Sequence, residues 1–376
     1  DEWRIAGGCK GRKFGGSEKY FGRYNSDWEN DCSKREDGLG EMILKMEWIF
    51  PTYNYTEKKF VNFRIENIYS GVYLAAFEEF IQFYAPDVVA PYATKYPPVK
   101  PRKKRVCRFC KKGFPDTLFR NNAHVIPQFL GNRYLIHNIE CDACNLKFGV
   151  YETSFADSIG LLRTTDILEG HRNIPKFKND GLVAYSEKDE LGNHKILIEA
   201  SDPKKAIYNE KEDSIIFRTK KTPYVPLHIM KVLFKIGYSL LGEDELVDYP
   251  HLEKIINTSD LDNKLQEYCK VLVFTFPNYF CNPFSITFKK REEFKDFRLP
   301  TKIVLVYFGR FMYEFVLLNS SDTFMIKKGE TGRVLYTPPY WDINNGMPSQ
   351  KIIDFSSPQV QYEEEEHLFT FDRKIK

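Results

Sequence analysis

The sequence predicts an α+β protein in which a small zinc-stabilised module, residues 101–160, lies between two larger α+β domains, residues 1–100 and 161–376. Two Cys-x-x-Cys pairs in the first half of the chain predict the module. Runs of β-branched and aromatic residues, alternating with segments of helical apolar spacing, predict mixed strands and helices on both sides of it. With 376 residues, the chain is long enough for two or three domains with apolar cores.

In the N-terminal domain, residues 1–40 are polar and rich in glycine, and we expect loops with weak short strands there. Residues 42–50 and 60–68 have the composition of strands. Residues 72–84 carry apolar side chains on one helical face, which predicts a helix that ends before Pro86. The role of this domain is unknown: substrate recognition, scaffolding and dimerisation all remain open.

The two cysteine pairs are Cys107-Arg-Phe-Cys110 and Cys141-Asp-Ala-Cys144, with 30 residues between them. Each pair can direct two thiolates at one ion, so four thiolates can surround a tetrahedral zinc. The alternative is a set of four free buried thiols. We expect a structural zinc ion.

Three polar residues lie among these pairs. His124 is in the β-prone run His124-Val-Ile, which Pro127 ends, and Asn138 and Asn145 follow, the latter directly after Cys144. A histidine in an apolar run is often structural, and an Asn near a helix start is often a cap, so both alternatives remain open.

This His, Asn, Asn series between zinc-binding pairs resembles the HNH endonuclease family over roughly residues 105–155, in a subclass with Ala-His-x-Ile-Pro and Cys-Asp-x-Cys-Asn patterns. The resemblance implies a ββα-metal fold, a hairpin followed by a helix. It implies that His124 is the general base that takes a proton from water and that Asn138 steadies the loop or the histidine. It also implies that Asn145 binds a catalytic divalent ion, Mg²⁺ or Mn²⁺, at the phosphate.

The chain departs from the family pattern at Ala123. Much of the family has Asp, Glu or His before the base histidine as a second metal ligand, and alanine cannot coordinate a metal. Carboxylates nearby in sequence that could substitute are Asp116, Glu140, Asp142 and Glu152. The alternative function is therefore a catalytically inactive zinc-knuckle module that binds DNA or protein.

A basic segment precedes and includes the first cysteine pair. Between residues 100 and 112 there are eight basic residues and no acidic one: Lys100, Arg102, Lys103, Lys104, Arg105, Arg108, Lys111 and Lys112. Such a segment would bind DNA phosphates, although a charged linker after Pro97-Pro98 is also consistent with it. The net charge of only +3 indicates that any DNA contact is local. Duplex DNA is the expected partner; no motif supports RNA.

In the C-terminal domain, helices are expected at residues 151–167, 230–241, ended by Gly242, and 252–256. A hairpin is expected at 182–186 and 195–199, with further strands at 215–219, 271–276, 285–288, 303–308 and 311–318, the last two joined by a turn. The acidic run 363–366 is expected in solvent. DNA binding, regulation and oligomerisation are all open roles for this domain, and the chain could form a homo-oligomer.

The remaining cysteines, at positions 9, 32, 269 and 281, form no disulfide pattern, which favours a reducing cytoplasm. No apolar run reaches the length of a membrane span. The sequence thus predicts a cytoplasmic, metal-dependent DNA endonuclease of the HNH type. By analogy with the family, it could act in bacterial antiviral defence, against foreign DNA.

Overall fold

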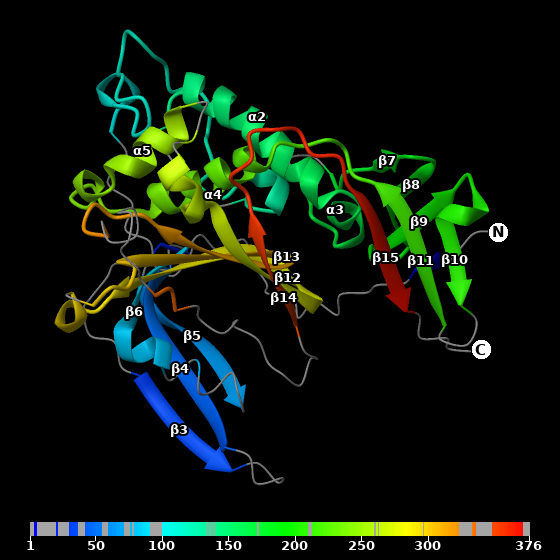
Figure 1. Cartoon of the computed structure of the whole chain (residues 1–376), viewed down its shortest axis with the longest axis horizontal. Coiled ribbons are helices and arrows are strands. Elements are labelled where there is room, and N and C mark those ends of the chain that lie inside the picture. Colours follow the sequence, from blue (N-terminus) through cyan, green and yellow to red (C-terminus); the bar gives the residue numbers. More distant parts are fainter. Residues whose placement is uncertain are drawn as a thin grey trace.

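The structure, a computed structural model, describes the following residues: 4–5, 20–21, 30–36, 42–54, 59–70, 76, 79–90, 100–133, 135–136, 138, 140–170, 173–209, 213–258, 261, 263–295, 297–322, 333–335 and 348–370. Groups of strands are separated by groups of helices along these residues, and every sheet contact among them is antiparallel, so the predicted α+β class is confirmed (Figure 1).

An N-terminal sheet has the order β2-β4-β3, with β5 on β4. Its strands are β2 (Tyr20–Phe21), β3 (Asn30–Glu36), β4 (Met42–Asn54) and β5 (Lys59–Ser70). The strands predicted at 42–50 and 60–68 are confirmed. Of the helix predicted at 72–84, residues 76 and 79–83 are helical and the others before Tyr84 lie outside the described residues. Strand β6 (Tyr84–Ala90) begins at Tyr84, so the helix ends earlier than predicted.

The central sheet contains two long strands, β12 (Lys270–Lys290) and β13 (Lys302–Leu317), with β14 (Ser349–Asp354) and β6 on the other edge of β12. The sequence predicted two strands and a turn at 303–318, which is wrong: β13 is continuous. Gly309 has φ +51°, a conformation that glycine adopts without strain, and the register shifts opposite it at Phe280. The irregular ladder bends β13 without ending it.

Helix α4 (Pro226–Leu240) is buried at every position except His228. It packs between the central sheet and α2 (Asp142–Ile159). Its apolar residues surround the helix, as expected for a helix in the middle of a core. Phe234 contacts Phe315 of β13 with ring centroids 6.2 Å apart. The helix predicted at 230–241 is confirmed. Short helices α3 (Leu162–Thr165) and α5 (Pro250–Asn257) follow α2 and α4 respectively.

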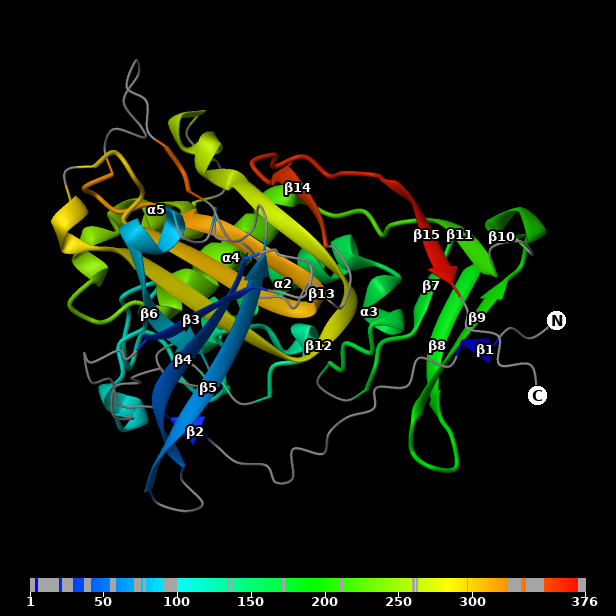
Figure 2. The same ribbon diagram turned by 90° about the horizontal axis from the view of Figure 1, so that it is seen from below.

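Two small sheets lie at one end of the molecule, and strands β3, β4 and β5 lie at the opposite end (Figures 1 and 2). One has the order β1-β9-β8-β7 and the other β10-β11-β15. Their strands are β1 (Arg4–Ile5), β7 (Phe177–Asn179), β8 (Leu182–Lys188), β9 (His194–Ala200), β10 (Ala206–Asn209), β11 (Ser214–Lys220) and β15 (Glu364–Thr370). The predicted hairpin and the strand at 215–219 are confirmed.

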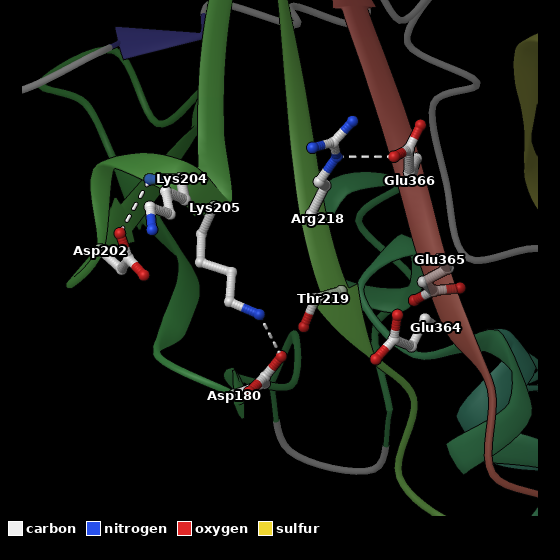
Figure 3. A pocket seen from close by; sticks show the side chains of 9 residues that line it. All are labelled: Asp180, Asp202, Lys204, Lys205, Arg218, Thr219, Glu364, Glu365 and Glu366. Carbon is white, nitrogen blue, oxygen red and sulfur yellow. Dashed lines mark hydrogen bonds and ion pairs between the residues drawn. The ribbon is translucent and has the colours of Figure 1, made fainter.

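The acidic run is exposed at Glu363, Glu364 and Glu366, as predicted, and Glu364 to Glu366 begin strand β15. Cross-strand ion pairs compensate the charges: Arg218 Nε lies 2.6 Å from Glu366 Oε1, and Lys221 Nζ lies 2.8 Å from Glu363 Oε2. Beside them is an open hollow of about 380 Å³, in which Lys205 points at Asp180 and Arg218 at Glu366 (Figure 3). Ion pairs therefore engage two of its cations, Lys205 and Arg218.

One apolar core joins the module to the central sheet. It includes Phe109, Val125 and Phe148 from the module together with Phe234 and Phe315. Strand β6, from the predicted N-terminal domain, also pairs with β12, Val88 opposite Thr287. The domain boundaries near residues 100 and 160 stay a prediction. None of the described helices combines the length and apolar character needed to cross a bilayer.

We expect two helix glycines to respond in opposite ways to alanine. A methyl group at Gly237 in α4 would lie 2.6 Å from Leu317 Cδ2, and Leu317 is fully buried, so Gly237→Ala should lower the free energy of unfolding by about 1–3 kcal/mol. At Gly149 in α2 a methyl group meets no atom within 4 Å, so Gly149→Ala should raise it by up to about 1 kcal/mol. Denaturant unfolding measures both; equal effects would contradict the packing of α4 on β13.

Candidate active site

The four predicted cysteines lie together. Their sulfur atoms are all within 4.8 Å of one another, and Cys110 Sγ lies 3.7 Å from Cys141 Sγ. Sulfurs around a tetrahedral zinc, with Zn–S bonds of about 2.3 Å, are separated by roughly 3.8 Å. A disulfide needs about 2.05 Å, and all four cysteines are free thiols. The cluster therefore fits a zinc ion held by Cys107, Cys110, Cys141 and Cys144, and it is the only such group among the described residues.

Local structure brings each pair to the ion. The first pair lies in a tight turn, in which Lys111 N donates to Cys107 O at 2.9 Å and Cys107 N to Lys112 O at 2.8 Å. The second pair starts helix α2: Cys141 is its N-cap, and its sulfur accepts from Cys144 N at 3.5 Å. A turn and a helix start are thus linked through four sulfurs.

The close approach of the four thiols shifts their pKa values in opposite directions. A hydrogen bond from Cys144 lowers the pKa of Cys107 to about 5. The same bond raises the pKa of Cys144, and burial raises that of Cys110. Four thiols this close favour only one thiolate among themselves, because each further negative charge is repelled. A divalent ion would allow the other thiols to ionise.

His124 lies at the base of a short hairpin. It forms an antiparallel bridge with Ile136, and Val125 N donates to Leu135 O at 3.0 Å. Val125 and Leu135 are buried in the common core, whereas the His124 side chain is half-buried. The β-prone run therefore places the imidazole at the boundary between core and solvent.

Asn132 is a site residue that the sequence analysis missed. Its buried side chain donates to Ile126 O at 2.6 Å and Leu135 O at 3.2 Å, and accepts from Leu135 N at 3.0 Å. Its amide nitrogen also lies 3.5 Å from His124 Nδ1. The sequence signal was Gly131, whose φ of +96° turns the chain just before Asn132.

The two other asparagines are placed as follows. Asn145 is half-buried in the first turn of α2, where its N–H donates to Cys141 O at 2.9 Å. Since Cys141 is the N-cap, the interpretation of Asn145 as the cap of this helix is wrong. Asn138 is half-buried in the turn before Glu140. The metal-binding role of Asn145 and the steadying role of Asn138 stay predictions.

Three of the four carboxylates proposed to replace the ligand missing at Ala123 are in ion pairs. Lys235 of α4, fully buried, lies 3.3 Å from Glu140 and 3.1 Å from Glu152. Burial raises the pKa of Glu140 to about 7 against the opposing charge of Lys235. Asp142 lies 2.8 Å from Arg120. Asp116 is exposed, and Ala123 itself is buried.

The basic segment divides into buried and exposed residues. Arg108, predicted to bind nucleic acid, is only 6% exposed. Its Nη1 donates to the carbonyls of Tyr238, Ser239 and Leu241 at 2.9–3.1 Å, and its Nη2 to Glu243 at 2.6 Å. These carbonyls lie at the C-terminal end of α4 and have no partner within the helix, so they attract the guanidinium into the core. The prediction for Arg108 is therefore wrong.

The other members of the segment differ in their exposure and in the partners that the described residues give their side chains. Lys111 is paired with Glu253 at 3.1 Å, and Arg105 is half-buried with its Nε donating to Lys100 O at 2.8 Å. The residues whose side chains are exposed and outside such pairs are Lys100, Arg102, Lys103, Lys104 and Lys112. Nucleic-acid binding by this segment stays a prediction.

Replacing Cys144 with serine should abolish zinc binding, because three thiolates and a hydroxyl hold zinc far more weakly than four thiolates do. We expect loss of one zinc per chain, measured by elemental analysis, and a lower melting temperature. Cys269→Ser is the control, since Cys269 is a buried free thiol outside the cluster and should keep zinc. A full zinc content in Cys144→Ser would rule out this metal centre.

Arg108→Ala should lower the free energy of unfolding by about 3 kcal/mol, because three carbonyls at the end of α4 lose a charged donor. Lys104→Ala removes an exposed cation of the same segment and should leave stability unchanged. Thermal or denaturant unfolding measures both. If the two variants unfolded alike, Arg108 would have no role in joining the module to α4.

Comparison with known proteins agrees with this arrangement. Residues 107–153 match the family model described as HNH endonuclease. No curated protein and no solved structure matches the chain. The match begins at the first zinc-binding cysteine and ends within α2, so it covers both cysteine pairs, the hairpin of His124 and the helix start with Asn145. The segment from Cys107 to Thr153 is therefore similar to the HNH endonuclease family.

Proposed function

We propose that the chain is a metal-dependent endonuclease that hydrolyses phosphodiester bonds in DNA, with His124 as general base and Asn145 as a ligand of the catalytic divalent ion. One observation carries the proposal. The four-cysteine cluster links two parts of the module. One is the turn before the His124 hairpin, and the other is the first turn of helix α2, which contains Asn145. The family match over the same residues supports it.

His124 is half-buried, with the side chain of Asn132 beside its Nδ1. The amide orientation of Asn132 is determined by its two carbonyl acceptors and by the Leu135 N–H, so its amino group, and not its oxygen, is next to His124 Nδ1. Both hydrogens of this amino group are directed at Ile126 O and Leu135 O, so the 3.5 Å contact does not assign the tautomer of His124. A neutral imidazole can take a proton from water near pH 7 and so produce the attacking hydroxide.

Asn145 would hold the catalytic ion through its side-chain oxygen. Oxygen ligands and phosphate suit magnesium or manganese better than zinc. When bound, such an ion supplies charge neutralisation at the scissile phosphate and the leaving oxygen. The zinc ion of the four cysteines has a different role, since a site with four thiolates has no open position for a substrate.

Duplex DNA is the proposed substrate, and the exposed cations Lys100, Arg102, Lys103, Lys104 and Lys112 are the proposed phosphate contacts. We further propose that the chain acts in the bacterial cytoplasm against foreign DNA. The domains on either side of the module would then supply target choice, control or oligomerisation.

A second candidate is a zinc-stabilised module that binds DNA or protein without cutting. The observation in its favour concerns the second metal ligand: Ala123 cannot coordinate a metal, and three of the four nearby carboxylates, Glu140, Asp142 and Glu152, are in ion pairs. The two candidates make opposite predictions about cleavage.

His124→Ala should reduce cleavage of supercoiled plasmid with magnesium or manganese by about 10²- to 10⁴-fold, since a general base contributes a factor of this size. Asn145→Ala should also lose cleavage while it retains zinc. His194→Ala is the control: this histidine lies in β9, bonded to Ser186, and its loss should not affect cleavage. Wild-type activity in His124→Ala would reject the base. A wild-type protein that binds DNA but cuts nothing with any divalent ion would favour the second candidate.

A further inference from the structure

Three large apolar side chains are exposed around the first cysteine pair. We define residues 102–118 as the knuckle loop. In it, Val106 is 56% exposed, Phe114 52% and Leu118 41%. Val106 bridges Gly113, and a methyl group at Gly113 would lie only 3.1 Å from Arg105 O, so the two sides of the loop are in close contact. Figure 1 shows this part of the chain, in cyan, projecting beyond α5 on the side away from the sheets.

Exposed positive charge surrounds these apolar side chains. Arg102, Lys103 and Lys104 form a short 3-10 helix whose residues are all exposed, and Lys112 is exposed on the other side of the loop. Lys103 Nζ lies 5.6 Å from the centre of the Phe114 ring, so the cation and the aromatic face belong to one surface. The knuckle loop contains one carboxylate, that of Asp116. The surface is therefore both apolar and cationic.

The knuckle loop is fastened to the two helices that border the candidate active site. Asp142 N, at the start of α2, donates to Leu118 O at 2.8 Å, and the Asp142 carboxylate accepts from the N–H groups of Arg120 and Asn121. Arg108 joins the loop to the end of α4. The loop therefore holds a constant position relative to the helix turn that contains Asn145.

We propose that the knuckle loop is a DNA-contacting surface in which the cations bind backbone phosphates and Phe114, flanked by Val106 and Leu118, packs against sugars and bases. Cations bind the phosphates of a duplex. An exposed aromatic ring can insert between two base steps or stack on a base that has left the stack. This combination of charge and apolar area is complementary to DNA. The inference rests on the proposed function, since it assigns further substrate contacts to the same module.

The experiment measures binding of the full-length chain to a fluorescent duplex without added magnesium or manganese. Phe114→Ala should weaken binding by about tenfold, because one stacking contact is lost, and the dependence of affinity on salt should not change. Phe114→Trp keeps an aromatic face and should bind as the wild type does. Lys103→Ala should weaken binding and reduce the salt slope by about one. Leu191→Ala, at a side chain 87% exposed in the β8–β9 turn, is the matched control and should have no effect.

A second duplex that carries a short mismatched stretch should bind the wild type more tightly than the paired duplex, because its bases unstack at lower cost, and Phe114→Ala should lose this preference. The inference is overturned if Phe114→Ala binds both duplexes as the wild type does, or if Leu191→Ala loses as much affinity. It is also overturned if Phe114→Ala loses only binding to vesicles of anionic lipid, which would make the loop a membrane-surface contact.

Binding and cleavage separate this inference from the proposed function. If the wild type cuts plasmid while Phe114→Ala binds and cuts equally well, the inference fails and the nuclease assignment stands. If the wild type cuts nothing but Phe114→Ala loses duplex binding, the knuckle loop contacts DNA and the nuclease assignment fails.

Discussion

The approach of four sulfur atoms to within 4.8 Å of one another is the constraint on which the module depends. Between residues 105 and 140 the described chain has little regular structure: one short 3-10 helix and isolated bridges. Such a segment gains few backbone hydrogen bonds to offset the entropy lost when it is ordered. A zinc ion bound by the four thiolates would supply that free energy at the two points where the turn and helix α2 begin.

Buried charge makes the second connection, between the module and α4. Lys235 reaches Glu140 and Glu152 from the helix, and Arg108 reaches the end of the helix from the module. Buried ion pairs contribute little net stability compared with apolar packing, yet loss of one partner costs about 3–5 kcal/mol. They therefore determine how the module is oriented on α4 more than how strongly it is held. A metal-stabilised turn alone would leave that orientation open.

The features that the sequence predicted are local ones. The cysteine pairs, the hairpin at residues 182–199 and the apolar pattern of α4 each depend on residues close together in the chain, where spacing determines geometry. The features that it missed depend on partners far away. Strand β13 continues through Gly309 because β12 pairs with it on both sides of the bend, and Arg108 is buried because the end of α4, some 130 residues later, needs donors. Asn132 was missed because its role depends on a hairpin that encloses it.

Strand β15 completes the sheet of β10 and β11, with Phe217 opposite His367. The intervening chain includes α4 and three strands of the central sheet, β12, β13 and β14. During synthesis, β11 leaves the ribosome before β15 does, so its hydrogen-bonding edge is unpaired until residues 364–370 have been made. Opposite charges line the two strands, with Arg218 opposite Glu366 and Lys220 opposite Glu364, and charged side chains on an unpaired edge disfavour pairing with other chains.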